Sequence, residues 1–146
     1  MRYQIVSVGR RAKDPLCEAA ELYGERLTHY TPTKFTRLSE AGGPAERQAL
    51  LEALDGAEHI VTMDERGEQL TTRELAKRVE RWQRSHKQVT LVVGGADGLH
   101  PDVKARAHES LALSKLTLPH RMALMLLLEQ LYRAHTILKG EPYHRN

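Results

Sequence analysis

Short apolar runs alternate along the chain with longer amphipathic stretches. Runs of apolar and β-branched residues that stop at a glycine or an acidic residue predict buried strands, and apolar residues that recur every three or four positions predict helices. The predicted strands are residues 3–8, 34–39, 59–64, 89–95 and, as a short strand or an extended segment, 111–118. The predicted helices are residues 15–29, 45–55, 72–87, 101–110 and 119–138.

This order of elements predicts an α/β fold with a mostly parallel sheet, because strands and helices alternate almost strictly. The run VTLVVGG at residues 89–95 is apolar over most of its length, as is typical of a central strand buried on both faces. Residues 41–44 and 65–69 are predicted loops. Thr71 or Thr72 is the predicted N-cap of the helix that follows the second loop.

The composition indicates one domain, which we expect to span residues 1–146. The net charge of +3 permits a nucleic-acid partner without requiring one, and the basic helix at 72–87 is either a solvated face or an RNA contact. The single cysteine, Cys17, suits a reducing compartment. The longest uninterrupted apolar run, at residues 122–128, is far below the roughly 20 residues that span a bilayer. We therefore expect a cytoplasmic protein without a membrane partner.

Three predicted strand ends carry the residues that suit a ligand site. They are Thr62–Asp64, the pair Gly94 and Gly95, and the segment Leu113–Leu118. In an open parallel sheet, ligands bind beyond the carboxyl ends of the strands, so these segments are expected to line one pocket. The two glycines either allow a ligand to approach the backbone closely or only form a tight turn. The spacing GGxxG is not the dinucleotide fingerprint, and no P-loop motif is present.

Metal and nucleophile chemistry have little support in the sequence. The eight histidines form no HExxH motif and no cluster with ligand spacing, so no metal site is predicted. The serines lack the GxSxG nucleophile elbow, which leaves a serine hydrolase unsupported.

The predicted helix at 119–138 is apolar on most of its circumference, which favours burial in a homodimer interface for a chain of this size. The tail after it brings an aromatic ring, an imidazole and a guanidinium together in Tyr143, His144 and Arg145. Such groups hold unstacked bases in RNA-binding proteins. The alternative is a tail that folds back onto the protein surface.

These motifs together resemble one family over essentially the whole chain. They are VSVGR at 6–10, TMDERG at 62–67, VVGGADG at 92–98, LSKLTLPH at 113–120 and LLLEQLYRAHTILKGEPYHR at 126–145. In this order they are similar to the 23S rRNA pseudouridine N3-methyltransferases, which are small, single-domain members of the SPOUT class.

The resemblance implies a SPOUT-like fold with a C-terminal trefoil knot, although true knots are very rare among proteins. It implies S-adenosylmethionine as the cofactor, bound in the knot, and no metal. The matching cofactor-binding positions are Met63, Gly94, Leu113, Ser114, Lys115, Leu116, Thr117 and Leu118, with Gly95 adjacent to them.

The resemblance also implies a homodimer in which the partner's tail completes each active site, and 23S rRNA within assembled ribosomes as the substrate. His144, Tyr143 and Arg145 are the expected catalytic groups, with His120 and Arg133 as secondary candidates. A general base is not identified, and Asp97 is given no role. Two alternatives share features with this interpretation. One is a SPOUT methyltransferase that acts on tRNA, and the other is a catalytically silent ribosome-binding factor.

Overall fold

The computed structural model describes residues 1–145; Asn146, the last residue of the expected domain, lies outside the described part. The strands are β1 (Arg2–Val8), β2 (Thr33–Leu38), β3 (Ile60–Gln69), β4 (Gln88–Val93) and β5 (Glu109–Ala112). The helices are α1 (Pro15–Thr28), α2 (Gly43–Ala53), α3 (Thr72–Ser85), α4 (Pro101–Lys104) and α5 (His120–Leu138).

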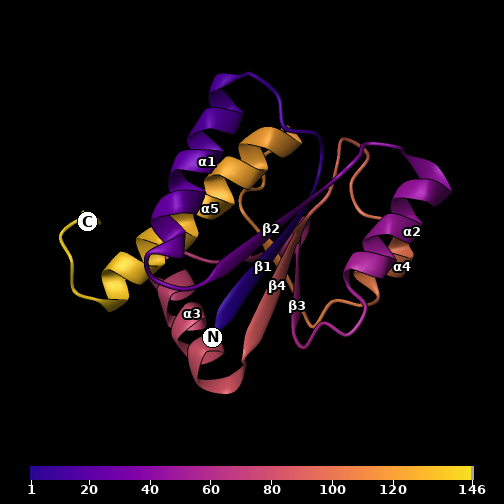
Figure 1. Cartoon of the computed structure of the whole chain (residues 1–146). Coiled ribbons are helices and arrows are strands. Elements are labelled where there is room, and N and C mark those ends of the chain that lie inside the picture. The colour runs from indigo at the N-terminus through magenta and orange to yellow at the C-terminus, as the bar shows by residue number, and fades with distance from the viewer. Residues whose placement is uncertain (146) are drawn as a thin grey trace.

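The five strands form one parallel sheet in the order β2-β1-β4-β3-β5. Helices α1, α3 and α5 cover one face of this sheet, and α2 and α4 cover the other (Figure 1). Strand β4 lies between β1 and β3 and is buried from Val89 to Val93, as its apolar sequence predicts. The α/β layer prediction is therefore confirmed.

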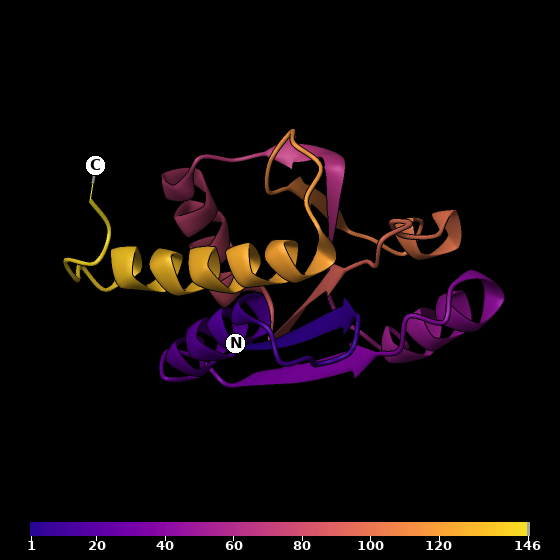
Figure 2. The ribbon, with the colours of Figure 1, turned by 90° about the horizontal axis from the view of Figure 1, so that it is seen from above.

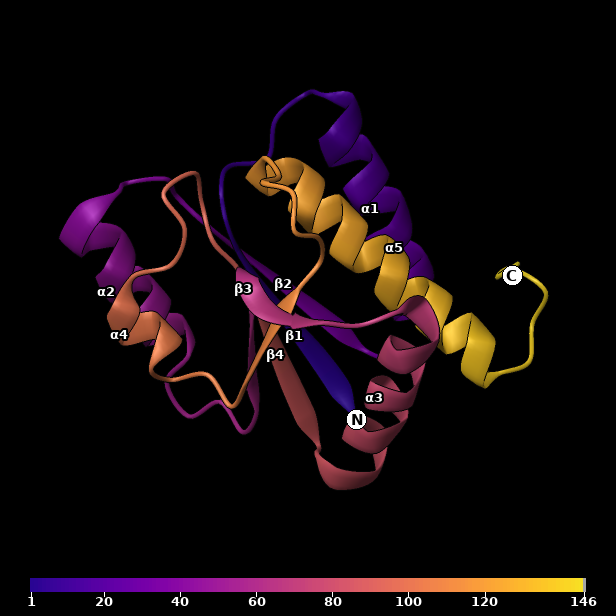
Figure 3. The same ribbon diagram turned by 180° about the vertical axis from the view of Figure 1, so that it is seen from behind.

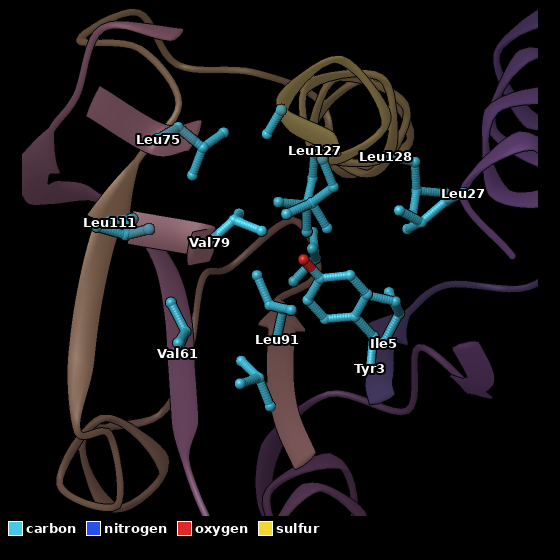
Figure 4. Close-up of a cluster of buried hydrophobic side chains, with 14 of the residues drawn as sticks. Tyr3, Ile5, Leu27, Val61, Leu75, Val79, Leu91, Leu111, Leu127 and Leu128 are labelled. Carbon is cyan, nitrogen blue, oxygen red and sulfur yellow. The ribbon is translucent and has the colours of Figure 1, made fainter. Parts of the chain in front are cut away.

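The larger hydrophobic core lies under α1, α3 and α5 (Figure 4). Leu127 and Leu128 of α5 point into it and are almost fully buried, as is Leu91 of β4. Each such side chain contributes about 1.5–3 kcal/mol when it is removed from water. A second cluster fills the other face under α2 and α4. The core therefore fixes the sheet, and the carboxyl ends of its strands carry the loops.

The predicted loop at 65–69 is wrong, because strand β3 continues through it to Gln69. The pairing of β3 with β5 breaks after Met63 and resumes at Glu68, so the residues between them bulge out of the ladder. At Gly67 the two strands lie so close that a β-carbon would stand 2.7 Å from the carbonyl carbon of Ser110. A glycine is required there, and this crossing has no local sequence signal.

The predicted helix at 101–110 is also wrong in extent, because α4 ends at Lys104 and Glu109 begins strand β5. The Glu109 carboxylate accepts hydrogen bonds from Trp82 Nε1 (2.7 Å) and His59 Nε2 (2.5 Å). It also pairs with Arg78. These contacts, together with pairing to β3, outweigh the local helical pattern.

Other boundaries agree closely with the sequence. Thr71 is the N-cap of α3, where its hydroxyl accepts from the Glu74 amide and the Glu74 carboxylate accepts from the Thr71 amide. Helix α5 packs against both α1 and α3 and begins after a segment that crosses back from the edge strand β5 (Figure 3). The trefoil knot stays a prediction. None of the described helices is long and apolar enough to cross a membrane.

Candidate functional site

A cavity of about 400 Å³ lies beside the bulge in β3 and the carboxyl end of β4. Met63 of β3 and Val93 of β4 are paired at its base. This volume falls within the roughly 300–1,000 Å³ that small-molecule and cofactor sites occupy. The residues that line it are Met63–Arg66, Val93–Leu99, Lys104, Leu113, Ser114, Leu116–Leu118, His120 and Ala123. The three strand-end segments that the sequence singled out therefore meet in one place.

Gly94 and Gly95 form the tight turn that the sequence predicts as one alternative, and the close approach of a ligand to them stays a prediction. A β-carbon on Gly94 would lie 2.9 Å from the Leu99 side chain and 3.1 Å from the backbone of Gly98. The amide of Gly98 closes this turn by donating to the Gly95 carbonyl at 3.1 Å, and Gly98 has a φ of +73°. The glycines thus form a tight turn and also line the cavity with bare backbone.

The segment after β5 forms the opposite wall. The Ser114 hydroxyl accepts from the Leu116 amide at 3.0 Å, and the Thr117 hydroxyl donates to the Glu65 carboxylate at 3.1 Å. These bonds hold the segment against the bulge of β3. Leu116 is 74% exposed, which is unusual for a leucine that lines a cavity. Lys115 is the one predicted cofactor-binding residue that does not line the cavity.

Charged groups of both signs surround the cavity. The Asp64 carboxylate lies 3.0 Å from the ammonium of Lys104. The hydrogen bond from the Arg66 amide and this ammonium hold the pKa of Asp64 below its usual value, against the effect of partial burial. The site therefore presents an ionised carboxylate at neutral pH.

His120, at the start of α5, forms part of the cavity wall. Its Nδ1 lies 3.3 Å from a carboxylate oxygen of Glu40, and its Nε2 is buried and makes no hydrogen bond with any described residue. The ring lies directly against Gly9, where a β-carbon would be 2.5 Å from Nε2. Glycine at position 9 thus leaves the space that this imidazole occupies.

The three predicted catalytic residues do not reach this cavity within their own chain. Helix α5 starts at the cavity and runs for 19 residues, about 28 Å at 1.5 Å per residue, before the tail begins. Figure 2 shows the C-terminal end at the far side from the loop that precedes α5. Tyr143 and His144 instead fold back onto the last turns of α5, and Arg145 is exposed.

Arg133 and Glu129 hold the tail in place. The Arg133 guanidinium donates to Glu129 at 2.7 Å, stacks 4.6 Å from the centre of the Tyr143 ring and contacts His144 Nδ1 at 3.3 Å. The Tyr143 hydroxyl donates to Glu129 at 3.3 Å. Burial, together with the Glu129 charge, raises the pKa of Tyr143 to about 12, so its hydroxyl remains a proton donor at neutral pH.

Sequence reasoning missed several residues of the cavity. Lys104 pairs with Asp64 across 40 positions of sequence, and no local pattern predicts such a contact. Glu65 and Arg66 also line the cavity. Their predicted position directly after a strand is a usable signal, because ligands bind beyond the carboxyl ends of parallel strands. Within residues 1–145, no three His, Cys, Asp or Glu side chains gather where they could hold a metal ion.

Comparison with known proteins identifies the family. Residues 1–144 match the family model described as a predicted SPOUT methyltransferase. The ribosomal RNA large subunit methyltransferase H of Anaeromyxobacter dehalogenans (strain 2CP-C) is 44% identical, covering 99% of this chain and 100% of that protein. The protein of the same description from Dechloromonas aromatica (strain RCB) is 41% identical, covering 99% of each chain.

Solved structures support the fold. A probable methylase family protein from Haemophilus influenzae Rd KW20 superposes with a TM-score of 0.58 at 13% identity, covering 99% of this chain and 70% of that one. A probable methyltransferase from Bordetella pertussis Tohama I gives 0.57 at 13% identity, covering 91% of this chain and 95% of that one. The family-model match over residues 1–144 and the full-length relatives together show that the chain belongs to the SPOUT methyltransferase family.

Proposed function

We propose that this protein transfers a methyl group from S-adenosylmethionine to N3 of a pseudouridine in 23S rRNA, on assembled ribosomes in the cytoplasm. Relatives matched over their full length are described as ribosomal RNA large subunit methyltransferases. The observation that carries the proposal is the cavity, in which Met63 of β3, Gly94 after β4 and most of the segment Leu113–Leu118 after β5 come together.

The lining of this cavity suits S-adenosylmethionine. Backbone peptide groups line the cavity at Gly94, at Gly95 and along the segment Leu113–Leu118. Such groups suit hydrogen bonding to the polar edge of a flat ring. The ionised carboxylate of Asp64 suits a cationic ligand. When bound, the cofactor supplies an electrophilic methyl group on a sulfonium. The task of the protein is to align N3 with that methyl group, which is chiefly a positioning problem.

The tail groups suit the base that accepts the methyl group. N3 of a pseudouridine lies between two carbonyl oxygens and gains negative charge as its proton passes to solvent water. The Tyr143 hydroxyl is a donor at neutral pH, and a His144 whose Nδ1 accepts from Arg133 presents its other nitrogen as a donor. Arg145 adds a positive charge. These groups stabilise the developing anion, which lowers the barrier without a strong base.

Within one chain the tail groups stay away from the cavity, because Tyr143 contacts Glu129, which lies nine residues of α5, about 14 Å, from His120 in the cavity wall. We propose a homodimer in which the tail of one protomer serves the cavity of its partner. Apolar side chains on α5 that its own chain buries only in part support such an interface; they are Met122, Ala123, Met125 and Leu126. An exposed Leu22 on α1 adds to the apolar surface.

The test is methyl transfer from labelled S-adenosylmethionine to ribosomes that lack the modification, followed by mapping of the labelled nucleotide. Label at N3 of a pseudouridine in 23S rRNA is the expected result. Label on tRNA instead would support S-adenosylmethionine as the cofactor and would refute 23S rRNA as the substrate. Label on neither, with no heat of cofactor binding by calorimetry, would favour a silent binding factor. Equal labelling of naked 23S rRNA would refute the requirement for assembled ribosomes.

A further inference from the structure

A second recess, of about 390 Å³, lies between the C-terminal ends of α1 and α5, at the opposite end of α5 from the cofactor cavity. Its lining side chains are aromatic, charged or imidazole groups, and none of them is aliphatic. They are Arg26, His29, Tyr30, Tyr132, Lys139 and Glu141. This composition suits a polar ligand with a flat ring better than an apolar peptide.

The aromatic rings of the recess continue into the tail. The Tyr132 ring lies 5.9 Å from the Tyr30 ring and 4.7 Å from the Tyr143 ring, measured between centroids. The Tyr30 hydroxyl donates to Glu141 at 2.6 Å, two residues before Tyr143. The recess and the tail that is proposed to hold the target base therefore share Tyr132 and a short piece of backbone.

The charge of the recess is positive in balance. The Arg26 guanidinium lies 5.6 Å from the centre of the Tyr132 ring, and Lys139 is exposed at the rim. Glu141 is the acid of the lining, and its carboxylate already accepts the hydrogen bond from Tyr30. The tyrosine rings meet edge to face. Cations beside aromatic rings are the combination with which proteins hold single-stranded nucleic acid, because the base stacks on a ring and the phosphate pairs with a cation.

We propose that this recess binds an unpaired nucleotide of the same RNA, adjacent to the target pseudouridine, with the base against Tyr30 and Tyr132 and the phosphate between Arg26 and Lys139. The proposal rests on the function proposed above. Binding of a nucleotide in the recess would help a protein with a net charge of only +3 to hold the RNA loop.

The first test is independent of methyl transfer. The dinucleotide UpU is titrated into the full-length protein while the tyrosine ring signals are followed by NMR. We expect saturable shifts of the Tyr30 and Tyr132 rings, with a dissociation constant on the order of 1–10 mM, and no shift of the buried Tyr3 ring. In the Arg26→Ala, Lys139→Ala double variant the affinity falls about tenfold. Arg47→Ala, which removes a cation from the other face of the sheet, leaves it unchanged.

Absence of shifts at Tyr30 and Tyr132, or equal shifts in the double variant, would overturn the proposal. The second test uses ribosomes that lack the modification. The double variant is expected to raise KM for ribosomes about tenfold, with kcat and cofactor binding within twofold of wild type. An unchanged KM would refute nucleotide binding in the recess but would not affect the proposed methyltransferase function. A wild-type protein that labels no ribosomes would refute the proposed function, while the UpU titration would still decide whether the recess binds nucleotides.

Discussion

The imidazole of His120 occupies the space that a side chain at Gly9 would need. A β-carbon at position 9 would lie 2.5 Å from His120 Nε2, and the backbone of Gly9 has a φ of +137°. Strand β1 ends at Val8, so this contact ties the end of the central sheet to the start of α5. It also fixes a side chain that lines the cavity proposed to bind the cofactor.

Gly9→Ala is therefore expected to weaken both the fold and cofactor binding. Backbone strain and displacement of His120 together should lower the free energy of unfolding by about 1–3 kcal/mol. Urea unfolding and calorimetry with S-adenosylmethionine measure the two effects. Gly56→Ala is the matched control, since Gly56 also has a positive φ (+72°) but has no atom within 4 Å of the added β-carbon. A Gly9→Ala protein that binds cofactor as tightly as the Gly56→Ala protein would contradict this role of Gly9.

His135 should make stability depend on pH. It is 2% exposed, and its Nε2 shares a hydrogen bond of 2.9 Å with the Tyr3 hydroxyl. Burial, with a smaller effect of the Lys139 charge, lowers the pKa of His135 from 6.5 to about 4. Between about pH 6.5 and pH 4, His135 is therefore protonated in the unfolded chain and neutral in the folded chain. The stability gained from neutral His135 is fully present above pH 6.5 and is lost as the pH falls toward 4.

This loss amounts to about 3 kcal/mol. Urea unfolding at several pH values between 7 and 4 measures it. His135→Gln should flatten the profile in this window, whereas His29→Gln, at an exposed position, should retain the wild-type slope. Equal slopes for all three proteins would show that another group causes the pH dependence.

Lys104 should reduce the preference of the cavity for a cationic ligand, because it neutralises Asp64 at a distance of 3.0 Å. Lys104→Gln leaves the carboxylate without this partner. We expect the affinity for S-adenosylmethionine to rise relative to that for its neutral thioether product by up to about fivefold, since a nearby charge in a watery site contributes about 1 kcal/mol. Calorimetry with both ligands measures the ratio. Lys104→Arg keeps the charge and should keep the wild-type ratio; an unchanged ratio in Lys104→Gln would count against the electrostatic role of Asp64.

Local patterns were enough to predict most of the elements and the meeting of three strand ends. The apolar run at Val89–Val93 and the capping box at Thr71 are signals contained within a few residues. The errors concern contacts between distant segments. Glu109 becomes part of an edge strand through partners on β3 and α3, and β3 crosses β5 at Gly67, which a single glycine in the sequence does not reveal. The sequence does not reveal the recess beside Tyr132 for the same reason, since its rings come from the turn after α1 and from α5.

The most direct test of the account is complementation between two inactive variants. Ala96→Trp places a bulky ring in the wall of the proposed cofactor cavity at an exposed position, and the Tyr143→Ala, His144→Ala double variant removes the tail groups. Each protein alone should fold, as circular dichroism checks, and should fail to label ribosomes. Co-refolded in equal amounts, they should recover about one quarter of wild-type labelling, because half of the dimers are mixed and each carries one intact cavity served by one intact tail. A mixture of folded dimers that stays inactive would contradict an active site shared between two chains.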